Sequence, residues 1–101
     1  MVEGQFLSTV RTIIDNTITD CNLQEYKIEY IIKKYSERLS NIKRSIEQNS
    51  MMNFRVKQKY LTVLNKVTLP PARVKHYDLV IIELRKNKLG IPSVIDFVKK
   101  N

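Results

Sequence analysis

A single apolar stripe runs from Ile28 to Ile46, and it constrains the fold more than any other feature of the chain. Its members, mostly three or four positions apart, are Ile28, Ile31, Ile32, Tyr35, Leu39, Ile42 and Ile46. At about 100° per residue, this spacing places all seven on one side of an α-helix. Asn22 suits an N-cap, and Glu25 three positions later resembles the second half of a capping box. The pattern predicts an amphipathic helix from about residue 23 to residue 48, about 39 Å long at 1.5 Å per residue.

Glycine and proline are scarce in this chain of 101 residues, and all of them except Gly4 lie beyond residue 69. Long periodic stretches with few such breakers are typical of helices. Apolar residues spaced by three and four predict two further helices, over 5–19 and 51–67. Pro71 suits a first helical position, which predicts a helix over 71–89, and Pro92 opens a short last helix.

The stretch 79–84, LVIIEL, is apolar on nearly every side. We therefore expect the 71–89 helix to be the most buried one. A strand over 76–84 is the alternative, because Val, Ile and Tyr favour strands. A helix is preferred, because the sequence offers no second strand to pair with it. The sequence thus predicts an all-α fold: one small helical bundle of four or five helices with a long amphipathic second helix.

The formal net charge of +8 is spread unevenly along the chain. Residues 1–26 carry a net charge of −3, whereas residues 27–101 carry +11. We expect one domain over 1–101 with three parts: a near-neutral or acidic first helix (1–21), a basic helical hairpin (22–67), and a proline-started buried helix with a short terminal helix (68–101). Such a basic body is suited to a polyanion, although charge of this size also serves solubility.

The residues needed for most catalytic chemistry are missing from the sequence. His76 is the only histidine, and no carboxylate or metal ligand stands three or four positions from it. Cys21 is the only cysteine, and two glycines cannot build a phosphate-binding loop. We therefore expect no enzyme activity, no catalytic residue, no metal, no cofactor and no small-molecule substrate.

Basic residues form two rows on the second and third predicted helices. Residues 33–75 hold eleven bases and two acids. The predicted nucleic-acid-binding residues are Lys33, Lys34, Arg38, Arg44, Arg55, Lys59, Lys66 and Tyr30. If the two helices pack as an antiparallel hairpin, the two rows could form one surface. Lysine meets phosphate as a point charge, so we expect largely sequence-independent contacts. The choice between DNA and RNA stays open.

Three tyrosines of the second helix have different expected roles. Tyr35 falls within the apolar stripe, so we expect it in the core. Tyr26 and Tyr30 project outward with the bases, where their rings could stack on bases or hydrogen-bond to sugars. Packing of both rings against another helix is the alternative, slightly favoured because large exposed aromatic side chains are costly.

A protein-interaction module is the main alternative to nucleic-acid binding. A long amphipathic helix, the Met51–Met52 pair and an apolar carboxy-terminal segment are typical of a subunit of a larger complex. The 23–48 stripe could also form the seam of a homodimer. No apolar run reaches the roughly 18–20 residues that span a membrane. The first ten residues do not resemble a secretory signal, so we expect an intracellular (cytoplasmic or nuclear) protein with a regulatory or accessory role.

Overall fold

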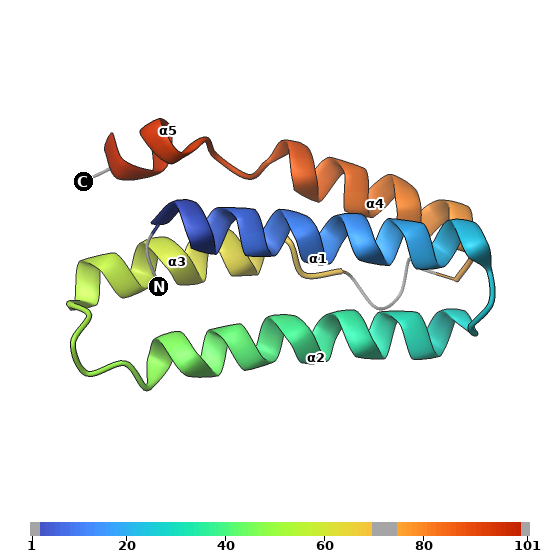
Figure 1. Cartoon of the computed structure of the whole chain (residues 1–101), viewed down its shortest axis with the longest axis horizontal. Coiled ribbons are helices and arrows are strands. Elements are labelled where there is room, and N and C mark those ends of the chain that lie inside the picture. The colour runs from blue at the N-terminus through green and yellow to red at the C-terminus, as the bar shows by residue number, and fades with distance from the viewer. Residues whose placement is uncertain (1–2, 70–74, 100–101) are drawn as a thin grey trace.

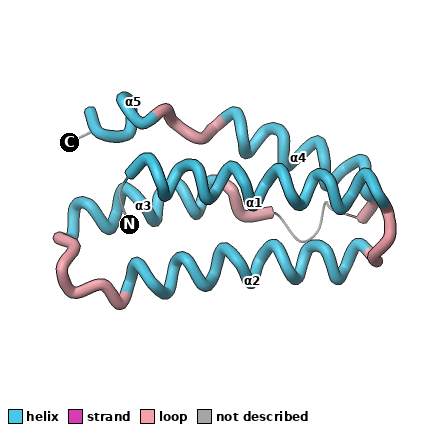
Figure 2. Tube along the Cα trace, viewed as in Figure 1, coloured by secondary structure: helices cyan, strands magenta, loops and turns pink. Residues whose placement is uncertain are grey.

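The computed structural model describes residues 3–69 and 75–99, which fold into five α-helices (Figure 1). The helices are α1 (Glu3–Leu23), α2 (Ile28–Glu47), α3 (Phe54–Lys66), α4 (Tyr77–Leu89) and α5 (Val94–Lys99). Within the described ranges the chain consists of helices and connections, without a strand (Figure 2). Helices α1 to α4 alternate in direction, and α5 lies beyond the end of α4. The predicted all-α bundle with a long second helix is confirmed.

Helix α1 is the central element, and it packs against α2, α4 and α5. Its buried side consists of Phe6, Leu7, Val10, Ile13, Ile14, Thr17 and Cys21. Thr17 fits among apolar side chains because its hydroxyl donates a hydrogen bond of 2.8 Å to the Ile13 carbonyl. Since Cys21 continues the same side, α1 extends four residues beyond the predicted end at Thr19. The helix ends at Leu23, and Gln24 directly after it has a left-handed φ of 54°.

Helix α2 begins at Ile28 rather than at the predicted residue 23. Asn22 lies within α1 and therefore does not cap α2, and Glu25 lies in the connection between the helices. Lys27 is the N-cap, without a side-chain hydrogen bond. The helix has 20 residues, so it is about 30 Å long. Its stripe faces inward as predicted, with Ile31, Tyr35, Leu39 and Ile46 buried.

Helix α3 begins at Phe54, because the Asn53 side chain accepts a hydrogen bond of 2.9 Å from the Val56 backbone and caps the helix there. The predicted start at Met51 lies in the connection. Buried in the centre of α3, the Tyr60 ring lies 4.3 Å from that of Phe6 and 5.2 Å from that of Phe97. These three rings join α3 to α1 and α5.

Helix α4 begins at Tyr77, so the prediction of a continuous helix over 71–89 is wrong at residues 75 and 76, which are not helical; Pro71 itself lies outside the described residues. His76 precedes the helix in extended conformation. The Tyr77 hydroxyl donates a hydrogen bond of 2.6 Å to the Tyr26 carbonyl, which fixes this end of α4 to the α1–α2 connection. The expectation that this is the most buried helix is also wrong. Leu79 is 41% exposed and Ile82 47% exposed, and α1 forms more of the core.

Candidate functional site

The rotation of α2 in the bundle determines which of its side chains reach the surface. Tyr35 is 1% exposed, as predicted for a core residue. Its hydroxyl donates a hydrogen bond of 2.7 Å to the carbonyl of Val67, which follows α3. The Asn87 side chain of α4 donates a second bond of 3.1 Å to the same oxygen. Burial raises the pKa of Tyr35 far above its ordinary value, so it remains a donor. This carbonyl therefore holds α2, α3 and α4 in a fixed relation.

A polar groove of about 210 Å³ separates α2 from α3. Its lining residues are Tyr35, Ser36, Leu39, Ser40, Lys43, Leu64, Asn65, Thr68 and Leu69. The lining therefore supplies hydroxyl groups, an amide and one cation above an apolar floor. At the end of α2, outside the lining of this groove, Lys57 donates a hydrogen bond of 3.2 Å to the Glu47 carbonyl. We call this the α2–α3 groove.

A second groove, of about 230 Å³, lies on the opposite side of α3. Its lining residues are Gln58, Lys59, Thr62, Val63, Lys66, Pro92 and Phe97. The Lys59 ammonium group lies 4.9 Å from the centre of the Phe97 ring, a cation–π distance that orients this lysine. We call this the α3–α5 groove. Helix α3 thus lies between two grooves, each with at least one lysine in its lining.

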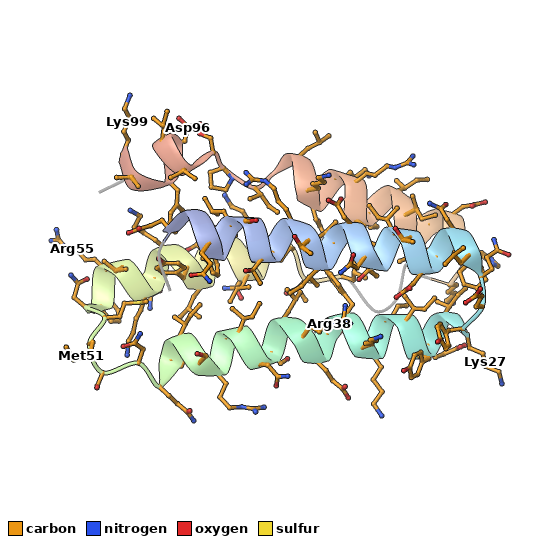
Figure 3. All side chains as sticks on the ribbon, viewed as in Figure 1. Lys27, Arg38, Met51, Arg55, Asp96 and Lys99 are labelled. Atoms are coloured by element: carbon orange, nitrogen blue, oxygen red, sulfur yellow. The ribbon has the colours of Figure 1, made fainter. Side chains whose placement is uncertain are left out.

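The structure separates the two predicted basic rows. On α2, Lys34 and Arg38 lie on one flank of the buried stripe, whereas Ser36 and Ser40 lie on the flank that faces α3. Both bases are half-buried. In Figure 3, the Arg38 side chain is directed toward α1. These bases therefore belong to a different surface from the third-helix row.

The third-helix row lies on the flank of α3 that is turned away from α2. Lys59 and Lys66 line the α3–α5 groove, and Arg55 is exposed farther toward the start of the helix (Figure 3). The remaining predicted bases, Lys33 and Arg44, are exposed on the outward side of α2. The hairpin expected from the sequence is present, but its two rows do not merge.

Tyr26 and Tyr30 are each about half exposed, at 50% and 51%. Their ring centres are 5.1 Å apart, so the two rings pack against each other, and they are not buried against another helix as the favoured alternative expected. Tyr26 lies in the α1–α2 connection, because α2 begins after it. Tyr30, a predicted binding residue, is thus accessible, but it lies near the start of α2, away from both grooves.

Sequence reasoning missed Lys43 and the polar residues beside it as members of a site. Ser36, Ser40 and Lys43 are spaced by four and three, which places them on one face of a helix next to the apolar stripe. This spacing was a usable signal. Asn65 and Thr68 gave no such signal, because only the packing of α3 against α2 brings them to the groove.

The charge around α3 is strongly one-sided. Helix α3 carries four bases, Arg55, Lys57, Lys59 and Lys66, and no acid occurs between Glu47 and Asp78. Among the described residues, no acid forms a salt bridge with Lys33, Lys43 or Arg44 of α2. The grooves therefore border a region of positive potential that no acid on α3 offsets.

Other kinds of site find no support within residues 3–69 and 75–99. No three His, Cys, Asp or Glu side chains in these ranges are grouped to hold a metal ion. The thiol of Cys21 is buried, and burial raises its pKa to about 11, which disfavours the reactive thiolate at neutral pH. Nor does any described helix combine the length and the apolarity needed to cross a membrane.

Comparisons of the chain with family models, curated proteins and solved structures found no match. The two grooves and the charge between them are therefore the features of this chain that point to a function.

Proposed function

We propose that the chain binds nucleic acid through its phosphates along α3, in a regulatory or accessory role. The observation that supports this is the position of an acid-free helix between two lysine-bearing grooves. Lysine, serine, threonine, asparagine and glutamine are all common phosphate and sugar contacts. Both grooves offer them: Ser40, Lys43 and Asn65 on one side, and Gln58, Thr62 and Lys66 on the other.

The length of α3 suits several successive phosphates. Arg55 and Lys66 are eleven residues apart, or about 16 Å along the helix axis. A duplex presents one phosphate per about 3.4 Å of axis on each strand, so this row spans a few phosphates. Contacts of this kind do not read base identity, and they release condensed counterions. The interaction should therefore weaken steeply with salt and depend little on sequence.

Charge reversal tests this function. Lys43→Glu changes the α2–α3 groove, and Lys66→Glu changes the α3–α5 groove. Both side chains are exposed, so the variants should keep the helix content of the wild type. Binding to labelled duplex DNA, duplex RNA and single-stranded RNA is measured across a salt series. We expect each substitution to reduce the slope of log affinity against log salt by about one.

Lys27→Glu is the matched control, because it changes the net charge equally but lies in the α1–α2 connection, far from Arg55 along the bundle (Figure 3). It should leave the salt slope close to that of the wild type. Equal losses in all three variants would show that only net charge matters. Wild-type binding that is already absent at low salt would overturn the proposal.

A further inference from the structure

Helix α4 is apolar on two opposite faces, and the bundle uses only one of them. Val80, Ile81 and Leu84 are buried on the inner face. The outer face carries Leu79, Ile82 and Leu89, which are 41%, 47% and 87% exposed. Figure 1 places α4 at the outside of the bundle, beside α1. Three large exposed aliphatic side chains on one helix indicate an interaction surface.

The spacing of this outer face is that of a helix–helix seam. Residues 79, 82, 86 and 89 are separated by three, four and three, as in the a and d positions of a coiled coil. Lys86 occupies the remaining position. The stripe of α2, which the sequence also offers as a seam, is buried inside the bundle and is therefore occupied. The outer face of α4 is therefore the apolar face that can pack against a second helix.

The charges of α4 favour a second copy of the same helix as the occupant. Lys86 forms a salt bridge of 3.8 Å with Glu83, and Lys88 forms one of 2.7 Å with Asp15. The other two charged residues of α4, Asp78 and Arg85, have no salt-bridge partner among the described residues. They are seven positions apart, so they lie on the same flank of the seam.

Asp78 lies in the first turn of α4 and Arg85 in its second half. In antiparallel orientation about a two-fold axis between Ile81 and Ile82, Asp78 of each copy approaches Arg85 of the other. Leu79 then packs near Ile82 of the partner, and Leu89 lies beyond the start of the partner's α4. Two-fold symmetry forms the Asp78–Arg85 pair twice, and the helix dipoles also oppose each other. We therefore propose that the chain forms a symmetric dimer in which α4 packs antiparallel against α4 of a second copy. This proposal does not depend on nucleic-acid binding.

The oligomer mass tests the dimer, measured by sedimentation equilibrium over a range of concentrations. The wild type should be a dimer. Ile82→Lys should be a monomer with unchanged helix content by circular dichroism. Met51→Lys is the matched control, because Met51 is 92% exposed but lies in the α2–α3 connection. This variant should remain a dimer. A monomeric wild type, or a dimer that persists in Ile82→Lys, would overturn the proposal.

A charge swap tests the orientation. Asp78→Arg and Arg85→Asp should each weaken the dimer by roughly tenfold, because each places like charges together twice. The double variant restores opposite charges across the seam, so its dimer should be tighter than that of either single variant. Damage to folding alone would instead accumulate in the double variant. A double variant that dimerises less than both single variants would overturn antiparallel pairing.

Discussion

At the scale of single residues, Gln24 has the least favourable backbone conformation. Its φ of 54° is the only positive value at a non-glycine position in the described chain. The left-handed conformation ends α1, and the Gln24 backbone N–H donates a hydrogen bond of 3.1 Å to the Asp20 carbonyl. Glycine adopts this conformation without the steric cost that a Cβ atom imposes. Gln24 is therefore a local source of strain at the turn that separates α1 from α2.

Gln24→Gly should raise the free energy of unfolding by about 1 kcal/mol, because it removes the Cβ conflict of the left-handed region. Thermal unfolding should show an increase of roughly 4–8 °C in Tm. Gln48→Gly is the matched control: Gln48 follows α2 with a φ of −86°, where glycine relieves nothing. Equal effects at both positions would contradict the strain at Gln24.

Cys21 makes stability depend on pH at the alkaline end. Burial, with a smaller contribution from the Asp20 carboxylate, raises its pKa from 9.0 to about 11. The folded protein thus holds the thiol proton more tightly than the unfolded chain does. The resulting stabilisation is fully present below pH 9 and is lost as pH rises to about 11. Between pH 8 and pH 11, the free energy of unfolding measured with denaturant should therefore fall by on the order of 2 kcal/mol more in the wild type than in Cys21→Ala. Parallel pH profiles for the two proteins would contradict this role.

At the scale of the elements, α2 and α3 begin in different ways. The Asn53 side chain accepts a capping hydrogen bond at the start of α3, whereas Lys27 at the start of α2 accepts none and places a positive charge near the helix amino terminus. Asn53→Ala should lower the free energy of unfolding by about 1 kcal/mol, and Lys27→Asp should raise it by about 0.5–1 kcal/mol. Chemical denaturation measures both. A destabilised Lys27→Asp protein would contradict the absence of a cap at α2.

The sequence predicted the existence of every helix but not all of the ends. Apolar spacing identifies α2 because its stripe is long and narrow. The sequence was less informative at the α1–α2 turn, where Asn22 and Glu25 have the spacing of a capping box but do not form one. There, Cys21 extends the buried side of α1 and delays the start of α2. Tertiary contact thus outweighed a local signal.

The burial of α4 could not be predicted from the pattern of its apolar residues either. Its stretch of apolar residues suggested burial on all sides, but a helix at the edge of a small bundle contacts its neighbours on one side only. Sequence alone could not separate the core residues Val80 and Leu84 from the exposed Leu79 and Ile82. The exposed face of α4 is identified by the structure, in which α1 covers the opposite face.

At the scale of the whole molecule, the arrangement of the helices decides which bases share a surface. Sequence reasoning selected Lys59 and Lys66 from the spacing of charges, and both line the α3–α5 groove. It could not determine which flank of α3 faces α2, because bases border the apolar side of α3 on both flanks. The α2–α3 groove, with Lys43, follows from that packing.

A dimer formed through α4 would carry a basic surface on each copy and a nearly neutral, largely apolar seam between the copies. Residues 77–89 carry three bases and two acids, whereas residues 48–76 carry six bases and no acid. Two copies of a chain with a net charge of +8 repel each other least where this charge is weakest. Dimerisation through α4 would double the number of phosphates that one particle contacts, which favours binding to long duplexes.

Nucleic-acid binding along α3 can be tested directly by titrating the ¹⁵N-labelled chain with a short duplex and following the amide chemical shifts at low and at physiological salt. We expect the shift changes to concentrate on α3 and on the Ser36–Lys43 face of α2, and to decrease as salt rises. The amides of Leu79 and Ile82 on α4 should change little on addition of duplex. Shifts confined to α1 or α4, or no shifts even at low salt, would contradict nucleic-acid binding along α3.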